Sequence, residues 1–263
     1  MSLITLTTDF GLCDSYVGVM KGVILSIAPT ARIVDLCHGI PPQDIVAGAL
    51  ALDQSTSFFP AGTIHVAVVD PGVGSARTTV IIETERATYI GPDNGLFDLV
   101  VQRERFKHAV ELKYPRYRLP VVSATFHGRD IFAPAAAHRF SGVPMDDFGP
   151  AMDYLPKLKL THPLPHGETL QVHILRVDHF GNIVTDLTPS VLSAWNPDTT
   201  PLTFEFLHSN FTGVVSTTYA DVPEGAPVAY FGSSGRLEIA IRNGNAAGFF
   251  KAARGFSVAV KKW

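Results

Sequence analysis

Asp70 and Arg77 stand at the two ends of a short glycine-containing loop, with the sequence Asp-Pro-Gly-Val-Gly-Ser-Ala-Arg over residues 70–77. A carboxylate that faces a guanidinium can hold and orient a water molecule, or it can form a structural ion pair that only fixes the loop. The apolar run at residues 66–69 predicts a buried strand that stops at Pro71, since proline cannot donate to a β-ladder. Asp70 is therefore expected at the carboxyl end of a strand, where open α/β sheets place their ligands.

Other polar residues also follow expected strands or stand in turns. Asp9 follows the alternating run at residues 4–8, His127 and Asp130 precede an alanine-rich stretch, and Asp178 and Asn182 stand in a turn between two strand patterns. Taken singly, each is a weak indication, because a lone histidine is more often a hydrogen-bonded structural residue than a catalyst. Their repeated placement at strand ends favours a functional site.

A metal site built from Asp9, Asp70, His127 and Asp130 is the alternative use of these side chains. No two of them share a helix face at the spacing of metal ligands. The sequence therefore predicts no metal.

The first half of the chain alternates between strand and helix patterns. β-branched and apolar runs predict strands, apolar residues at helical spacing predict helices, and Asp44 and Asp130 are expected N-caps. Such alternation is typical of an α/β fold, a mostly parallel sheet with flanking helices. The expected strands are residues 4–8, 32–36, 63–70, 79–83 and 87–90, and the expected helices are 16–27, 45–51, 96–101 and 131–140.

The second half of the chain has short, closely spaced strand patterns, which indicate a small β-barrel domain. Residues 170–178 and 183–187 form an expected hairpin, followed by strands at 202–207, 214–216, 228–231, 237–242 and 256–261. The predicted organisation is an N-terminal α/β domain at 1–155, a linker at 156–167 and a C-terminal β-barrel domain at 168–263.

Composition limits the partners and the compartment. The net charge of −3 and the lack of basic blocks argue against nucleic acid. No apolar run is long enough to span a membrane, and the N-terminus does not have the pattern of a signal peptide. Cys13 and Cys37 fit no disulfide or metal framework, which is typical of a reducing compartment. A cytoplasmic protein is therefore expected.

Six motifs occur in the order of one known family: Thr-Asp-Phe-Gly at 8–11, the loop at 70–77, Gly-Pro-Asp-Asn-Gly-Leu-Phe at 91–97, Thr-Phe-His-Gly-Arg-Asp-Ile-Phe-Ala-Pro at 125–134, Asp-His-Phe-Gly-Asn at 178–182 and Ser-Gly-Arg-Leu-Glu-Ile-Ala at 234–240. Over essentially its whole length the sequence resembles the S-adenosylmethionine (SAM) hydrolases, or SAM hydroxide adenosyltransferases, which are related to fluorinase and chlorinase. The resemblance implies an α/β domain, a β-barrel domain and a homotrimer with active sites between neighbouring subunits. It also implies SAM as substrate, with no further cofactor.

The resemblance assigns roles to individual residues. Asp70, Arg77 and His127 match the family's Asp-Arg-His triad. Asp9 matches the acid that holds the ribose hydroxyls, and Asp178 a residue near the methionine amine. The remaining matches are substrate contacts: Asn182 at the adenine with Phe180 beside it, Tyr219 as a stacking aromatic, Ser233 and Glu238 from the barrel, and Phe126 as a further substrate-binding residue.

Two positions separate this sequence from the halogenating relatives. Fluorinase carries a tyrosine where Asp70 stands, and a halide-contacting serine where Gly128 stands; chlorinase also lacks the acid. A carboxylate repels a halide but can deprotonate water. Gln43 stands near the position of a fluorinase tryptophan that packs on the substrate, which leaves the methionine pocket unassigned.

The implied reaction is attack of water-derived hydroxide on ribose C5′, giving adenosine and methionine. The sulfonium leaves as a neutral thioether, so no general acid is required. Two arrangements stay open: Asp70 and His127 share the water proton while Arg77 stabilises hydroxide, or the site mainly positions water. A SAM-binding protein without turnover, a halogenase, and an α/β-plus-barrel protein with structural ion pairs are the alternative readings.

Overall fold

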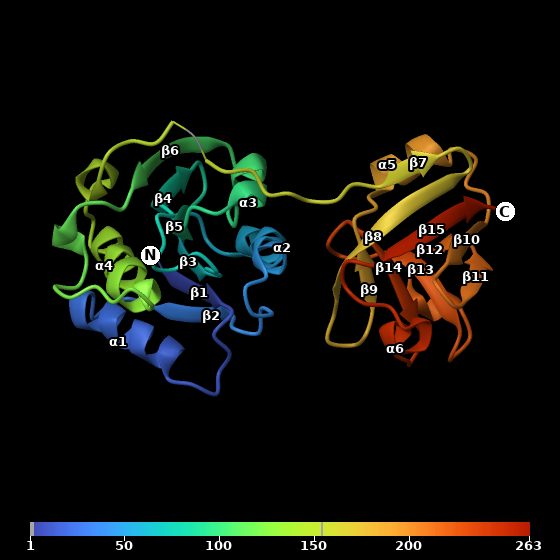
Figure 1. Cartoon of the computed structure of the whole chain (residues 1–263), viewed down its shortest axis with the longest axis horizontal. Coiled ribbons are helices and arrows are strands. Elements are labelled where there is room, and N and C mark those ends of the chain that lie inside the picture. The colour runs from blue at the N-terminus through green and yellow to red at the C-terminus, as the bar shows by residue number, and fades with distance from the viewer. Residues whose placement is uncertain (1–2, 154) are drawn as a thin grey trace. The chain divides into compact units, whose positions relative to one another are not determined.

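Two fully buried parallel strands, β1 (Ile4–Thr8) and β3 (Ile64–Val68), are neighbours inside a six-stranded sheet in the computed structural model (Figure 1). The structure describes residues 3–153 and 155–263, so Met1, Ser2 and Tyr154, which fall in the predicted N-terminal domain, lie outside it. The chain divides into two compact units at Lys159 and Leu160. Each unit is described separately below.

The first unit has the predicted α/β architecture. Its strand order is β2-β1-β3-β5-β4-β6. The pairings β1–β2, β1–β3 and β3–β5 are parallel, whereas β4 pairs antiparallel with β5 and β6. The other strands are β2 (Ile33–Cys37), β4 (Thr79–Thr84), β5 (Thr88–Pro92) and β6 (Phe106–Glu111).

Side chains that alternate along the strands build a hydrophobic core on each face of this sheet. Val66 and Val68 of β3 pack in one cluster with α1 (Tyr16–Ile27) and α4 (Ala133–Phe140). Ala67 and Val69 point the other way, into a cluster with α2 (Ile45–Ser55) and α3 (Asp98–Arg103). The sheet therefore lies between two helical layers (Figure 1).

Of the two predicted N-cap residues, one caps a helix and the other does not. Asp44 caps α2 as predicted, since its carboxylate accepts from the Ala47 N–H at 2.8 Å. The prediction for Asp130 is wrong, because a π-helical turn (Gly128–Phe132) precedes α4 and contains this residue. Its buried carboxylate instead accepts from the Ser123 backbone N–H at 2.8 Å and from Arg129 Nε at 2.6 Å. A backbone N–H before the turn and the neighbouring Arg129 side chain thus replace the expected capping bond.

The second unit is a nearly closed, barrel-like sheet, as predicted (Figure 1). Its strand order is β11-β10-β15-β8-β9-β14-β13-β12, with β7 paired to β8. Alternating residues such as Leu170, Val172 and Ile174 fill its interior. The strands are β7 (Leu164–His166), β8 (Thr169–Val177), β9 (Ile183–Thr185), β10 (Leu202–Glu205), β11 (Asn210–Gly213), β12 (Val215–Ser216), β13 (Pro227–Phe231), β14 (Leu237–Ile241) and β15 (Ser257–Lys262).

Four elements of the second unit are not predicted from the sequence. They are the edge strands β7 and β11 and the short helices α5 (Pro189–Trp195) and α6 (Ala246–Phe250). Helix α6 begins at Asn245, whose side chain accepts from the Gly248 N–H at 2.7 Å. Short turns of 3₁₀-helix complete the fold at Thr56–Phe58, Pro115–Tyr117, Met145–Phe148 and Tyr219–Asp221. Among the described residues, no helix is both long enough and apolar enough to cross a membrane.

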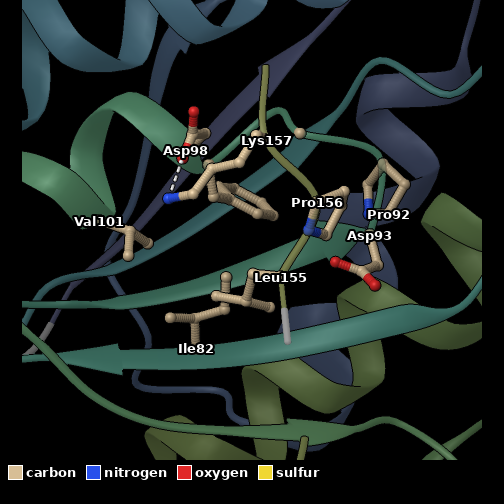
Figure 2. A pocket seen from close by; sticks show the side chains of 10 residues that line it. Ile82, Pro92, Asp93, Asp98, Val101, Leu155, Pro156 and Lys157 are labelled. Atoms are coloured by element: carbon tan, nitrogen blue, oxygen red, sulfur yellow. Dashed lines mark hydrogen bonds and ion pairs between the residues drawn. The ribbon is translucent and has the colours of Figure 1, made fainter. Parts of the chain in front are cut away.

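The segment that leaves the first unit is fixed to it by Asp98. Figure 2 shows Leu155, Pro156 and Lys157 beside a small pocket, with Lys157 directed at Asp98. The Asp98 carboxylate accepts from Lys157 Nζ at 3.0 Å and from the Leu158 backbone N–H at 3.0 Å. Burial raises the pKa of Asp98, but hydrogen bonds from Gln102, Lys157 and Leu158 outweigh burial and leave this pKa lowered. The ionised carboxylate therefore stabilises the start of the connection.

We expect Asp98→Asn to lower the free energy of unfolding of the first unit by roughly 1–2 kcal/mol at pH 7. Because the folded-state pKa of Asp98 is lowered, this stabilisation is complete above the unfolded value of about 4 and is lost as the pH falls through the folded value. Urea unfolding of both proteins between pH 7 and pH 3 measures the difference, which should shrink at the acid end. Glu85→Gln, at an exposed pair with Arg105, is the control that should have no effect. A difference that is independent of pH would contradict the assignment.

Candidate active site

A pocket of about 390 Å³ opens at the carboxyl ends of β1 and β3, and it contains most of the N-terminal residues predicted to act. Parallel strands bring their carboxyl ends to the same edge of a sheet, so segments far apart in the sequence meet there. Its lining consists of Asp9, Phe10, Tyr16, Pro42, Gln43, Val68, Asp70, Pro71, Val73, Thr125, Phe126, His127 and Gly128.

Arg77 joins Asp70 to His127, as a triad requires. Its Nε donates to Asp70 Oδ1 at 2.8 Å, and its Nη2 donates both to Asp70 Oδ2 and to His127 Nδ1, the latter at 2.9 Å. The side chains of Arg77 and Asp70 are only 10% and 5% exposed, so the pair is shielded from water. The guanidinium also lies over the Phe132 ring, 5.5 Å from its centroid.

The hydrogen-bonding capacity of Arg77 fixes the state of His127. A guanidinium has only donors, so His127 Nδ1 must accept with its lone pair, and the neutral ring carries its proton on Nε2. Burial lowers the pKa of His127, the charge of Arg77 lowers it further, and Asp70 partly opposes both effects. His127 is therefore a neutral imidazole at pH 7.

The loop between Asp70 and Arg77 is shaped by turns and a close approach. The Val73 N–H donates to the Asp70 carbonyl at 3.2 Å, and the Ser75 N–H donates to the Gly72 carbonyl at 3.1 Å. Gly74 has φ +77°, and a Cβ there would lie 2.5 Å from the Ala124 carbonyl oxygen. A glycine at 74 therefore lets the loop pack against the segment that leads to His127.

Asp9 also lines the pocket and is held by a backbone hydrogen bond. Its Oδ2 accepts from the backbone N–H of Gln43 at 2.7 Å. Gln43 has φ +65°, an uncommon conformation for a residue with a side chain, and it places this N–H toward Asp9. Gln43 thus lines the pocket and also holds the Asp9 carboxylate with its backbone N–H.

Three aromatic rings form one wall of the pocket. Phe10, Tyr16 and Phe126 pack edge to face, with centroid separations of 5.2–5.9 Å. Phe126 was predicted to bind substrate, whereas Phe10 and Tyr16 were not. Phe10 lies inside the quoted Thr-Asp-Phe-Gly motif, which is the signal that could have found it; for Tyr16 the helical pattern concealed any other role.

Gly128 leaves little room for a side chain. An added Cβ would lie 3.1 Å from Met20 Sδ, 3.3 Å from the Phe126 ring and 3.4 Å from the Phe10 ring. A serine at this position would require Met20 and the neighbouring rings to shift by a few tenths of an ångström. The space beside His127 is therefore shaped by the absence of a side chain at residue 128.

The second unit contains a separate group of predicted residues around a pocket of about 510 Å³. Asp178, Phe180, Asn182 and Tyr219 line it, together with Ala240, Ile241, Arg242, Asn243 and Gly244. Asp178 holds the β8–β9 turn: Oδ1 accepts from the N–H groups of Phe180 and Asn182 at 2.9 and 2.8 Å, and Oδ2 accepts from Asn182 Nδ2 at 2.9 Å. Phe180 and Tyr219 are 74% and 58% exposed, so both rings are accessible.

Ser233 and Glu238 do not line this pocket. Ser233 is exposed in the turn between β13 and β14. Glu238 accepts from Tyr230 Oη at 3.0 Å, and burial and the charge of Asp178 raise its pKa, against the hydrogen bonds of Tyr230 and Ser234 and the charge of Arg176. Burial and Glu238 also raise the pKa of Tyr230. The substrate contacts predicted for Ser233 and Glu238 stay predictions.

Neither pocket contains an evident metal centre. Within residues 3–153 and 155–263, no three or more His, Cys, Asp or Glu side chains are grouped so that they could hold a metal ion. The polar groups on the pocket walls are instead suited to hydrogen bonding with a small polar molecule.

The chain is a two-unit protein, with an α/β unit that has polar side chains at its strand ends followed by a barrel-like unit. Models of the SAM hydroxide adenosyltransferase N-terminal and C-terminal domains match residues 4–149 and 172–259. The chain belongs to the SAM hydroxide adenosyltransferase family, as the sequence motifs indicated.

Individual proteins show the same relationship. The chain is 41% identical to the (R)-S-adenosyl-L-methionine hydrolase of Thermus thermophilus, over 91% of each chain. It is 27% identical to the fluorinase of Nocardia brasiliensis, over 98% of this chain and 96% of that protein. The crystal structure of an uncharacterized conserved protein from Thermotoga maritima matches 99% of this chain and 100% of its own, with a TM-score of 0.91 and 30% identity.

We expect Arg77→Gln to raise the pKa of His127. The substitution removes a cation that opposes protonation and leaves the Asp70 carboxylate, which favours it. Asp70→Asn should lower the same pKa. Titration of the imidazole resonances by NMR measures both shifts. The control signal is His138, whose pKa is lowered by burial and by Arg116, because neither substitution touches its surroundings. A shift in the opposite direction in either variant would refute the proposed electrostatic coupling.

Proposed function

We propose that this chain hydrolyses S-adenosyl-L-methionine to adenosine and L-methionine, with attack at ribose C5′. The observation that carries the proposal is the buried arrangement of Asp70, Arg77 and His127 on the wall of a pocket that also presents Asp9. A protein that only binds the substrate needs no such water-activating group. Relatives that bear the name (R)-SAM hydrolase, at 38–41% identity, support the reaction and favour the (R) configuration at the sulfonium.

The chemistry balances with water as the only co-reactant. A water oxygen forms a bond to C5′ while the C5′–sulfur bond breaks, and its electron pair stays on sulfur. Methionine leaves as a neutral thioether, so neither a general acid nor a cofactor is needed to assist departure. One water proton is released to the protein and then to solvent. The main tasks of the protein are to place water in line with C5′ and to accept that proton.

Hydrogen-bonding capacity favours Asp70 as the proton acceptor. Arg77 has no acceptor, and the lone pair of His127 Nδ1 is occupied by the Arg77 N–H. Each carboxylate oxygen of Asp70 accepts one bond from Arg77 and has a further lone pair available for water. Arg77 also carries the positive charge that stabilises a nascent hydroxide, and His127 Nε2–H can donate to the water oxygen. This division of roles keeps the hydroxide-stabilising Arg77 of the first arrangement, but it makes Asp70 alone the proton acceptor and His127 a donor to the water oxygen.

Halide transfer is the second candidate, because fluorinases match most of the chain. The Asp70 carboxylate on the pocket wall would repel an anionic nucleophile, and the space at Gly128 does not admit a serine without movement of Met20, Phe126 or Phe10. Both features favour water over halide. A SAM-binding sensor without turnover is the third candidate and is separated from the others by product analysis.

The protein's assembly and compartment form part of the proposal. We propose a homotrimer in which each substrate is bound between neighbouring subunits, as the resemblance to the family implies. The predicted substrate contacts fall into two groups, one in each unit. We also propose a cytoplasmic location, since Cys13 and Cys37 are unpaired. The net charge of −3 supports small-molecule substrates rather than nucleic acid as the partner.

We expect purified protein incubated with (R)-SAM to release equal amounts of adenosine and methionine, independent of added fluoride or chloride. Asp70→Asn and Asp70→Ala should reduce turnover by roughly 10²–10⁴-fold, since the general base is lost. Liquid chromatography measures the products, and calorimetry with adenosine checks that the variants still bind nucleoside. Asp53→Asn, which breaks a surface pair with Arg103, is the control with unchanged turnover.

Each outcome of this assay separates the candidates. Near-normal turnover by Asp70→Asn would remove Asp70 from the mechanism. A halogenated nucleoside would favour the halogenase, and tight binding of SAM without product would favour the sensor.

A second prediction addresses the trimer. Asp70→Asn and Asn182→Ala subunits, each inactive alone, are co-expressed with different affinity tags, and assemblies that contain both are isolated in two steps. If each site combines Asp70 of one subunit with Asn182 of its neighbour, every mixed trimer has one intact site and about a third of wild-type turnover. Light scattering establishes the mass of the assembly. Mixed assemblies without activity would show that each site is built within a single subunit.

A further inference from the structure

A chain of hydrogen bonds lies directly behind Asp9, and the proposed chemistry does not use it. Thr8 Oγ1 and His38 Nδ1 are 2.8 Å apart, and His38 Nε2 is 3.0 Å from Asp35 Oδ1. Lys21 Nζ of α1 donates to Asp35 Oδ2 at 2.6 Å. Thr8 is fully buried and His38 is 5% exposed, whereas the side chains of Asp35 and Lys21 are 41% and 34% exposed. The chain thus connects the surface of the protein to the end of β1.

The direction of each hydrogen bond follows from what each group can donate. The Asp35 carboxylate is an acceptor, so the proton between it and His38 belongs to His38 Nε2. When this is the only proton on the ring, Nδ1 has a lone pair and the Thr8 hydroxyl donates to it. The Thr8 oxygen keeps its own lone pairs and accepts from the Phe10 backbone N–H at 3.2 Å. His38 therefore sets the orientation of the Thr8 hydroxyl.

Two bonds connect His38 to the turn that carries Asp9. Through Thr8 it fixes the Phe10 N–H, and its own carbonyl accepts from the Gly11 N–H at 2.9 Å. Asp9 lies between Thr8 and Gly11, the two residues that hydrogen-bond to His38, and its carboxylate accepts from the Gln43 N–H at 2.7 Å. Because both backbone neighbours of Asp9 on its carboxyl side are held, the carboxylate has a defined place on the pocket wall.

We infer that His38 is a positioning residue for nucleoside recognition, which holds the Thr8–Gly11 turn so that Asp9 can accept from both ribose hydroxyls. Asp35 and Lys21 fix the His38 ring from the other side. This inference rests on the proposed function, in which Asp9 contacts the ribose. His38 itself does not touch the substrate, since it does not line the pocket.

The chain offers a matched control in the same strand. Thr5 Oγ1 of β1 and His65 Nδ1 of β3 form a second buried threonine–histidine pair, at 2.7 Å. Thr5 and His65 are 0% and 1% exposed, so this pair is buried as deeply as Thr8 and His38. It lies earlier in β1, and neither residue lines the pocket. Loss of either threonine hydroxyl should destabilise the fold similarly, but only loss of the Thr8 hydroxyl should change ribose recognition.

The test compares Thr8→Val, Thr8→Ser and Thr5→Val in binding to adenosine and to 2′,3′-dideoxyadenosine, which lacks both ribose hydroxyls. Isothermal titration calorimetry gives both dissociation constants for each protein, and circular dichroism confirms folding at the assay temperature. We expect Thr8→Val to weaken adenosine binding about tenfold with little change for the dideoxy compound. The ratio that matters is the dissociation constant for the dideoxy compound divided by that for adenosine. Thr8→Ser, which retains the hydroxyl, and Thr5→Val should keep the wild-type value of this ratio.

A second variant keeps the test valid if Thr8→Val does not fold. His38→Leu should reduce the same ratio about as much, whereas His38→Asn, whose amide oxygen can accept from Thr8, should restore part of it. An unchanged ratio in the folded Thr8 and His38 variants, or an equal loss in Thr5→Val, would overturn the positioning role. If wild-type protein does not bind adenosine, or binds the dideoxy compound equally well, the ribose role of Asp9 in the proposed function fails as well.

Discussion

The organisation of the candidate active site depends on one guanidinium. Arg77 donates to both carboxylate oxygens of Asp70 and to His127 Nδ1, so it fixes the place of two side chains and the tautomer of one. A buried carboxylate is costly unless it is paired and hydrogen-bonded, and a bidentate guanidinium meets both needs. The fold supports this pair with Phe132 on one face of Arg77 and with a loop whose turns return Arg77 to the end of β3.

The sheet provides the frame on which such groups can meet. Successive side chains of a strand point to opposite faces of the sheet. Val66 and Val68 therefore pack in one hydrophobic core and Ala67 and Val69 in the other, so apolar packing holds β3 on both faces. Parallel pairing with β1 then places Asp9 and Asp70 at one edge. The polar side chains there do not need to stabilise the fold, because the buried apolar faces already do. Because the apolar faces stabilise the fold, the hydrogen bonds of these polar side chains can serve to bind a ligand.

Local patterns predicted most of the fold, because the main elements have strong local signals. The helix at 16–27 and the strand at 4–8 were predicted with their observed limits, and Asp70 and Arg77 were expected to face each other. Features that depend on tertiary partners were not predictable in this way. Asp130 has the residue type of an N-cap, yet Ser123 and Arg129 occupy its carboxylate. The bond between Thr8 and His38 joins the end of β1 to the residue after β2, thirty positions further along the chain, so no local pattern indicates it.

The identity of the nucleophile is set by few atoms on this scaffold. A halide requires a site that compensates negative charge, whereas water requires an acceptor for its proton. In the proposed mechanism Asp70 is that acceptor, and its pairing with Arg77 leaves no net positive charge available for an anion. Replacement of the carboxylate alone would free the Arg77 charge for an anion, but Met20, Phe126 and Phe10 crowd the position of Gly128. On the proposed mechanism, conversion to halide chemistry requires a change at Asp70. A serine at residue 128 would in addition require Met20, Phe126 and Phe10 to shift by a few tenths of an ångström, so the charge and the shape of the site are determined by different residues.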